Sequence, residues 1–330
     1  GVPADYRIGI VPASDTGAVE MALWSLLGPR PVDVLAWESF GQEWVSDITE
    51  SLRLPNTRVM TAGYGALPDF SAVDFTHDVV FVWNGTTSGA RVPNGDWIPA
   101  DRAGLTICDA PPASNLVAWG RASMPWAASP PNTFCQEKVT TSSLSHGMVI
   151  LSPRAAERLT SFEPTVPLPK IFRLAKDRKI DEGIFEGATI NTPSMLCVED
   201  YLDALKWSAE VGGLSALVAR SQRNLAVLAA WVARTPWVEF LVGEEAIRSS
   251  TSICLVIRAP WFEALDAKGR SAAVEKMTAL LAAENVAYDI NAYRSAPPGL
   301  RIWGGATVES SDLEALMPWL DWAYAQVAPA

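Results

Sequence analysis

The sequence contains few of the side chains that bind transition metals, with only two histidines and four cysteines in 330 residues. The cysteines are scattered and lack the short spacings of zinc ligands; they are Cys108, Cys135, Cys197 and Cys254. This scarcity argues against a metal site, and we expect no metal. Free thiols are typical of a reducing compartment, so we expect the protein to be cytoplasmic.

A long apolar run and an excess of positive charge are also lacking. The longest strongly apolar run, residues 225–233, is too short to cross a bilayer, and the start of the sequence does not resemble a secretory signal. The sequence has 26 lysines and arginines and 37 acidic residues, which gives a formal net charge of −11 at pH 7. This balance argues against nucleic acid or an anionic membrane surface as the main partner.

What the sequence does contain is the composition of a globular protein with a large core. Apolar residues make up 49% and charged residues 19%, and the 14 tryptophans are natural anchors of a core or of a subunit interface. The length suits two domains or one large α/β unit.

In the first half, short apolar strands alternate with helices. We expect strands over 7–11, 32–37, 79–83, 105–108 and 148–151, and helices over 14–27, 42–52 and from 153 to about 159. The strands at 79–83 and 105–108 are continuously apolar rather than alternating. This pattern is typical of a mostly parallel sheet covered on both faces, and therefore predicts an α/β fold.

The second half predicts two long helices followed by a smaller α+β unit. The helices cover 195–209, after a cap at Thr192, Pro193 and Ser194, and 214–233. After them we expect strands at 252–257 and 300–303, and helices at 272–284 and 312–325. We place a domain boundary near residue 220, with a large domain over 1–220 and a small one over 221–330.

Several polar segments follow the predicted strands. The hydroxyls and backbone N–H groups of residues 14–16 open a helix, where a phosphate binds well. The loop 84–89 follows a parallel strand, at the edge of the sheet where ligands bind. Arg294 and Arg301 flank a Pro-Gly turn, and forked hydrogen bonds from them could hold two anionic groups of one substrate. The structural alternatives are an ordinary helix cap, a plain turn and two surface arginines.

An acid and a lysine complete the pattern. Asp109 ends the strand at 105–108, and Lys138 lies eight residues before His146, which opens the strand at 148–151. In fold-type I pyridoxal-phosphate enzymes a lysine and an acid in such positions hold the cofactor. The alternative for Lys138 is a solvated surface lysine, and for His146 we favour a structural, hydrogen-bonded role.

Taken together, these segments resemble the phosphoserine aminotransferase family of the class-V aminotransferases over nearly the whole chain. The motifs that carry the resemblance are PASDTGAVE (12–20), LAWESFG (35–41), WNGTTSG (83–89), HGM (146–148), SPRA (152–155), INTPSML (190–196) and PGLRIW (298–303). The resemblance implies a fold-type I transferase with a mostly parallel large domain and a smaller α+β C-terminal domain. It also implies pyridoxal 5'-phosphate as the cofactor.

The resemblance also implies roles for individual residues at the cofactor. Lys138 matches the Schiff-base lysine, Asp109 the acid that faces the pyridine nitrogen, and Thr86 the threonine beside the ring hydroxyl. Trp44 falls close to the tryptophan that stacks on the ring. The residues that match the cradle of the cofactor phosphate are Ser14, Asp15 and Thr16.

Further matches concern the partner subunit and the substrate. Asn191 and Thr192 match residues that reach the phosphate from the other subunit, which implies a homodimer with shared active sites. Arg301 matches the arginine that holds the α-carboxylate of the substrate, and Arg294 one that helps to hold its phosphate. The implied reaction is reversible amino transfer between glutamate and 3-phosphohydroxypyruvate, a step of serine biosynthesis.

The sequence departs from the family in two places. It starts some dozens of residues after the family's usual start, and it differs around Lys138, where the preceding residues 110–133 also do not match. Glu137 stands where the family has a neutral amide near the cofactor phosphate, so two negative charges would lie close together. Two alternatives therefore stay open: another class-V aminotransferase, such as the alanine–glyoxylate type, or a truncated or degenerate homologue without catalysis.

Overall fold

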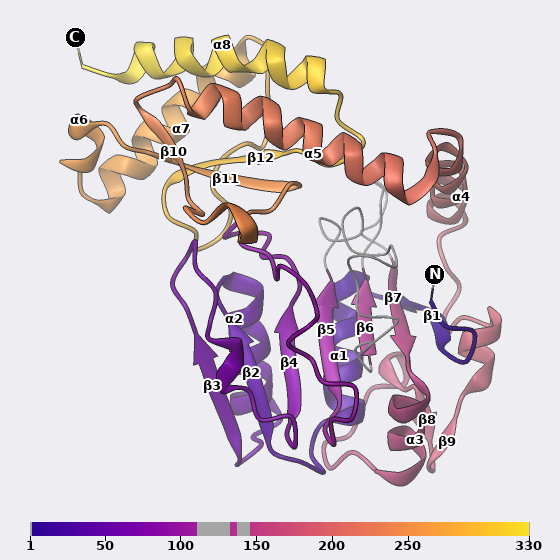
Figure 1. Ribbon diagram of the computed structural model, residues 1–330. Coiled ribbons are helices and arrows are strands. Elements are labelled where there is room, and N and C mark those ends of the chain that lie inside the picture. Colours follow the sequence, from indigo (N-terminus) through magenta and orange to yellow (C-terminus); the bar gives the residue numbers. More distant parts are fainter. Residues whose placement is uncertain (1, 111–132, 137–145, 330) are drawn as a thin grey trace.

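The computed structural model describes residues 2–110, 133–136 and 146–329, of which 133–136 are described by their backbone alone. Lys138 and Glu137 lie outside the described residues. The described chain forms a large part built on a seven-stranded sheet and a smaller part built on a three-stranded sheet. Figure 1 shows the smaller part above the end of the large sheet to which β4 and β5 point.

The large sheet has the strand order β1-β7-β6-β5-β4-β2-β3. Its strands are β1 (Arg7–Pro12), β2 (Val32–Ala36), β3 (Thr57–Thr61), β4 (Asp78–Val82), β5 (Thr106–Ala110), β6 (Thr133–Gln136) and β7 (His146–Leu151). Only β7 runs antiparallel to its neighbours, β1 and β6, and the other strand pairs are parallel. The prediction of a mostly parallel sheet in an α/β fold is therefore confirmed.

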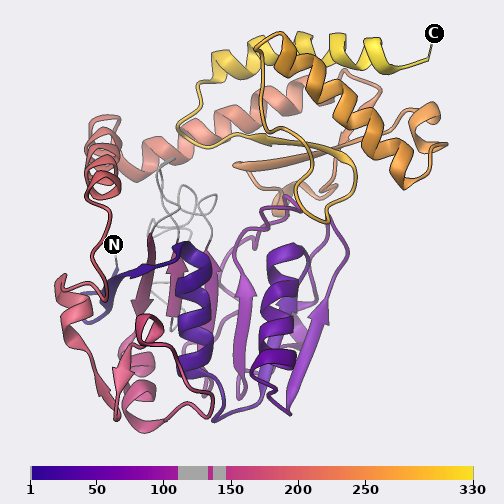
Figure 2. The same ribbon diagram turned by 180° about the vertical axis from the view of Figure 1, so that it is seen from behind.

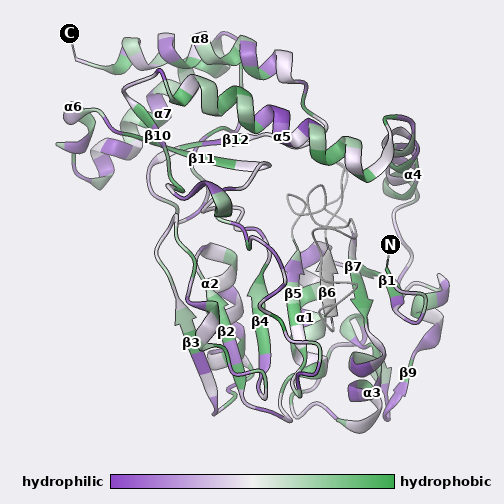
Figure 3. Ribbon diagram, in the orientation of Figure 1, coloured by the Kyte–Doolittle hydropathy of each residue, from purple (hydrophilic) through white to green (hydrophobic). Residues whose placement is uncertain are grey.

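Helices cover the sheet. The helices of this part are α1 (Ser14–Leu26), α2 (Ser39–Ser46), which continues as a π-helical turn (Asp47–Ser51), and α3 (Pro153–Ser161). Figure 2 shows α1 and α2 lying against the same face. Every residue of β2, β4 and β5 is buried, as the continuous apolar runs of β4 and β5 predict. Figure 3 shows β4 and β7 as largely hydrophobic strands.

Buried ion pairs lie at the amino edge of the sheet, where the parallel strands β2 and β4 begin. Asp78, the first residue of β4, accepts a hydrogen bond from the backbone N–H of Leu105 at 2.7 Å and pairs with Arg158 of α3 at 2.9 Å. Asp33 of β2 pairs with Arg58 and lies 2.8 Å from Nδ1 of His77. Both carboxylates are fully buried, so their charges depend on these partners.

The smaller part packs helices on one antiparallel sheet with the order β10-β11-β12. Its elements are α4 (Met195–Glu210), α5 (Gly213–Val232), β10 (Val238–Phe240), β11 (Ser252–Ile257), α6 (Pro260–Glu263), α7 (Ala267–Ala283), β12 (Gly299–Trp303) and α8 (Ser310–Val327). A second apolar core starts at Leu228 in α5 and reaches Ala323 in α8. Residue 220 lies inside α5.

Shorter elements complete the described chain. They are a hairpin of β8 (Ala175–Lys176) and β9 (Lys179–Ile180) and 3₁₀ helices at Phe70–Ala72, Lys170–Phe172, Glu182–Glu186 and Glu245–Ile247. None of the helices in the described residues combines the length and the hydropathy that a bilayer span requires. The same residues contain no cluster of three or more histidine, cysteine or acidic side chains placed to hold a metal ion.

Candidate active site

The segments that follow the parallel strands meet at the carboxyl edge of the large sheet, beneath the smaller part. Backbone hydrogen bonds join the two parts there: the Arg91 N–H donates to Ile247 O, and the Ser249 N–H donates to Gly89 O, both at 2.8 Å. Ligands of such sheets bind at this edge because the loops there are free to vary. It is also the edge at which most of the predicted site residues lie.

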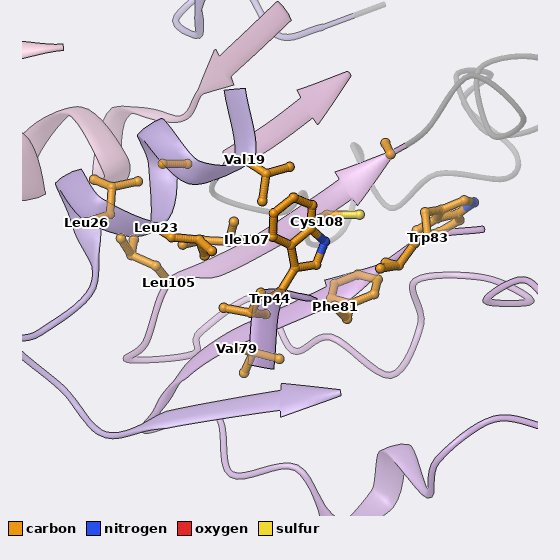
Figure 4. Packing of buried hydrophobic residues seen from close by; sticks show 14 of the residues in the cluster. Val19, Leu23, Leu26, Trp44, Val79, Phe81, Trp83, Leu105, Ile107 and Cys108 are labelled. Atoms are coloured by element: carbon orange, nitrogen blue, oxygen red, sulfur yellow. The ribbon is translucent and has the colours of Figure 1, made fainter. Parts of the chain in front are cut away.

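Asp109 and Trp44 are buried at this edge and are hydrogen-bonded to each other. The Trp44 indole N–H donates to Asp109 Oδ2 at 2.9 Å, and the two residues are 2% and 3% exposed. Figure 4 shows the Trp44 ring among Val19, Phe81 and Cys108. The sequence predicted a tryptophan that stacks on the cofactor ring, but the structure gives Trp44 almost no exposed surface and places it as a hydrogen-bond donor to Asp109.

The start of α1 lies next to β7. Ala13 and Ser14 both have left-handed backbone angles, with φ of 66° and 59°, a strained arrangement for two successive residues other than glycine. Among the described residues, no side chain caps the helix at Ala13, while the Thr16 N–H donates to Asp15 Oδ1 at 2.8 Å. A Cβ on Gly147 would lie 2.0 Å from Ser14 O, so only glycine allows β7 to approach so closely. An uncapped helix start of this kind suits a phosphate group.

The loop after β4 is held tightly in place. A Cβ on Gly85 would lie 2.2 Å from Ser88 Oγ, which explains the glycine at this turn. From the smaller part, the Ser252 hydroxyl donates to Thr86 O at 2.6 Å. The Thr86 side chain itself is partly exposed, at the edge where the sequence predicted it.

Glu38 fixes this loop to the start of α2, a role that the sequence analysis missed. Its carboxylate accepts hydrogen bonds from the Thr87 hydroxyl at 2.8 Å and from the Gly41 N–H at 2.9 Å. Burial raises the pKa of Glu38, and the hydrogen bonds that it accepts act in the opposite direction. The signal that could have found it is its position directly before the helix, where an acidic side chain caps the first turn.

The two predicted arginines both lie close to the same aromatic ring, that of Tyr293. The guanidinium carbon of Arg301, on β12, is 4.8 Å from the centroid of the Tyr293 ring, and that of Arg294 is 5.6 Å from it. Arg301 also lies 3.7 Å from Asp289 Oδ2, and its buried Nε has no hydrogen-bond partner among the described residues. The structure thus brings together the two cations that the Pro-Gly turn separates in sequence.

Arg294 is one of the residues through which the smaller part contacts α2. Its guanidinium carbon lies 4.1 Å from the centroid of the Phe40 ring, and its Nη1 pairs with the carboxylate of Glu43. Phe40 lies one helical turn before Trp44, so the two rings share a face of α2. Phe40 is therefore the aromatic ring of α2 at the rim of this site. The motif LAWESFG already contained it, but no role was assigned to it.

A cluster of three hydroxyls lies beside Arg294. Ser39 Oγ is 2.9 Å from both the Tyr64 hydroxyl and Ser295 Oγ, and these two are 3.0 Å apart. Ser39 starts α2, Tyr64 follows β3, and Ser295 directly follows Arg294. The cluster thus fixes the segment that carries Arg294 to the large part.

Asn191 and Thr192 are exposed rather than packed into the site of their own chain. They lie in the segment before α4. In the same segment, the backbone N–H of Ser194 donates to His146 Nε2 at 3.2 Å. His146 therefore has a structural hydrogen bond, as predicted. The same hydrogen bond also fixes the start of α4 to the start of β7.

Lys138, the predicted Schiff-base lysine, lies outside the described residues. The backbone of β6 runs parallel to β5 and pairs residue 136 with Ala110. The described end of β6 therefore lies at the same edge of the sheet as Asp109. This is the edge at which the sequence places the lysine.

Comparison with known proteins identifies the family. No protein-family model matches the chain. A phosphoserine aminotransferase from Methanosarcina mazei, however, is 54% identical over 324 residues, which cover 98% of this chain and 84% of that protein. The chain belongs to the phosphoserine aminotransferase family. The predicted family, cofactor class and enzyme class, a pyridoxal-phosphate-dependent transaminase, are confirmed.

Solved structures show the same fold at much lower identity. The PLP-bound phosphoserine aminotransferase from Trichomonas vaginalis has a TM-score of 0.73 at 16% identity, covering 97% of this chain and 83% of that one. An alanine–glyoxylate aminotransferase from Nostoc sp. has a TM-score of 0.69 at 17% identity, covering 96% and 81%. Both confirm the fold-type I architecture, and neither separates the two substrate classes, because likeness at such identity concerns the fold alone.

Proposed function

We propose that this chain catalyses reversible amino transfer between glutamate and 3-phosphohydroxypyruvate, which gives phosphoserine and 2-oxoglutarate. The observation that carries the proposal is the placement of Arg294 and Arg301 on one aromatic ring at the carboxyl edge of the sheet. Two cations so placed suit a substrate with two anionic ends. The identity with relatives named for phosphoserine supports the same choice.

The described residues fit pyridoxal phosphate. Asp109 offers a buried carboxylate, which the Trp44 N–H orients, for the protonated pyridine nitrogen, and the uncapped start of α1 offers N–H groups and the hydroxyls of Ser14 and Thr16 for the phosphate. When bound, the cofactor supplies an electron-accepting ring that stabilises negative charge at the Cα of the substrate. The negative charge of Asp109 would favour a proton on the ring nitrogen, and Thr86 would lie beside the ring hydroxyl.

Lys138 has two tasks in this proposal. It would hold the cofactor covalently, and as a free amine it would move a proton to and from the Cα of the substrate as general base and acid. Arg301 holds the α-carboxylate, because its Nε is buried without a partner among the described residues. Arg294 holds the phosphate.

A homodimer with shared sites is part of the proposal. No residue of α4 is buried, and its large apolar side chains are exposed by 61% at Met195, 73% at Leu196, 53% at Leu202 and 45% at Leu205. Exposed apolar surface of this kind suits a subunit interface. Asn191 and Thr192 lie a few residues before this helix and would reach the cofactor phosphate of the partner subunit.

We also propose a cytoplasmic location. Among the described residues, Cys254 is a free thiol, as expected in a reducing compartment.

Steady-state kinetics test the proposed substrate. With 2-oxoglutarate as acceptor, kcat/KM for phosphoserine should exceed that for alanine by at least about 100-fold, because alanine leaves the phosphate-binding groups unpaired. A preference for alanine with glyoxylate would support the alanine–glyoxylate alternative instead. A purified protein that stays colourless with added pyridoxal phosphate would support the non-catalytic alternative.

A further inference from the structure

Arg294, the proposed phosphate ligand, already has an anionic partner within the chain. Glu43 of α2 contacts its Nη1, although the two residues are 251 positions apart in sequence. The Glu43 side chain is 49% exposed and that of Arg294 is 35% exposed. The pair is thus open to solvent, and a second anion can approach it.

The surroundings of Glu43 are acidic. Glu20 of α1 and Asp47, directly after α2, line a hollow of about 340 Å³ together with Glu43. Burial raises the pKa of Asp47 to about 6, and the charges of Glu20 and Glu43 add to this rise. Burial and the charge of Glu43 also raise the pKa of Glu20. Arg294 therefore compensates the charge at the rim of an acidic cluster.

Contacts other than that with Glu43 also hold Arg294 in place. Its backbone is fixed in the left-handed region with φ of 55°, and its guanidinium lies over the Phe40 ring. The next residue, Ser295, is bonded to the hydroxyls of Ser39 and Tyr64. These contacts orient the arginine while the Glu43 carboxylate occupies part of its hydrogen-bonding face.

We propose that Glu43 is an internal counter-ion that competes with the phosphate of the substrate for Arg294, and so limits the affinity of the site for phosphorylated substrates. The inference rests on the proposed function, in which Arg294 takes the phosphate. A dianionic phosphate that approaches the guanidinium must displace the carboxylate or share the cation with it at the cost of repulsion. A substrate without a second anion, such as alanine, leaves the Arg294–Glu43 pair intact.

Phosphate binding to the holoenzyme tests this competition directly. Calorimetric titration with inorganic phosphate should show about fivefold tighter binding in Glu43→Gln than in the wild type, which corresponds to about 1 kcal/mol, the upper value for an exposed ion pair. KM for phosphoserine should fall by a similar factor while kcat stays the same, and KM for alanine should not change.

Two matched variants make the test specific. Glu20→Gln removes a neighbouring negative charge that does not contact Arg294, and it should leave the Kd for phosphate within about twofold of the wild type, since it breaks no ion pair. In an Arg294→Ala background, Glu43→Gln should bring no gain, because the two groups act on each other.

The possible outcomes separate the inference from the proposed function. Weaker phosphate binding in Glu43→Gln would mean that Glu43 positions Arg294, and an equal gain in Glu20→Gln would mean a general field effect. Either result overturns the competition. If the wild type does not transaminate phosphoserine, the proposed function fails. The phosphate titrations then still decide whether Glu43 competes for Arg294.

Discussion

The two edges of the seven-stranded sheet use charged residues in different ways. At the amino edge, Asp78 and Asp33 are fully buried and each is paired with an arginine. At the carboxyl edge, the Arg294–Glu43 pair is half open to solvent, and Arg301 retains a buried Nε without a partner among the described residues. We propose that the buried pairs at the amino edge stabilise the fold, whereas Arg294 and Arg301 at the carboxyl edge serve to bind a ligand. Substitutions at the two edges should therefore change different quantities.

The largest effect on catalysis is expected at Asp109. Asp109→Asn removes the negative charge that favours a proton on the pyridine nitrogen, so turnover should fall by about 10³-fold, as for the loss of a key electrostatic contact. The melting temperature should change little, because asparagine can still accept the Trp44 hydrogen bond. Coupled assays and thermal melts of the same preparation check both quantities. Turnover close to that of the wild type would refute the pairing.

The largest effect on stability is expected at the amino edge. Arg158→Met leaves the carboxylate of Asp78 buried without its cation, so the free energy of unfolding should fall by about 3–5 kcal/mol. kcat per folded molecule should stay the same. Denaturant titration measures the loss, with Lys206→Met as the control, because its ion pair with Glu210 is exposed and should contribute less than about 0.5 kcal/mol. Similar losses in the two variants would contradict the comparison of the edges.

Arg301→Ala should weaken the binding of every amino-acid substrate, whatever its side chain. It removes a charged hydrogen-bond donor to the α-carboxylate, a group that every amino-acid substrate carries, at a cost of about 1.5–3 kcal/mol. KM for phosphoserine and for alanine should rise alike. In Arg294→Ala, by contrast, only KM for phosphoserine should rise, and KM for alanine should stay the same. A loss confined to one substrate in Arg301→Ala would assign this arginine to a different group.

The smallest effect is expected at Asp47, in the pH dependence of the free energy of unfolding. The folded-state pKa of Asp47, about 6, lies above its ordinary value of 3.8. The native state therefore binds the proton more tightly than the unfolded state, and stability falls as the pH rises from about 4 to about 6. Asp47→Asn should remove this loss and stabilise the protein by about 1 kcal/mol at pH 7, a value reduced for partial exposure. Unfolding titrations at pH 4 and pH 7 should show the gain at pH 7 alone.

Local patterns in the sequence predicted most of the fold. Continuous apolar runs predicted β4 and β5, and the helix after the Ser194 cap was also found. β3 was missed because it is a largely exposed edge strand, and β10 because it has three residues. The helix expected at 272–284 starts earlier, at Ala267, where the Asp266 side chain caps it.

The candidate site was less predictable, because its decisive contacts join distant parts of the chain. The position of Asp109 at a strand end followed from the sequence. Its bond to Trp44 spans 65 residues, and the Glu43–Arg294 pair spans 251. No local periodicity carries such information, so the bond between Trp44 and Asp109 was not predicted and Glu43 received no role.

The central claim is that the carboxyl edge of the sheet holds pyridoxal phosphate between Asp109 and a lysine that follows β6. The most direct test is borohydride reduction of the yellow holoenzyme, followed by peptide mapping of the reduced cofactor adduct. We predict a single adduct at Lys138, which is lost in Lys138→Ala. An adduct at Lys170 or Lys176 instead would contradict the account.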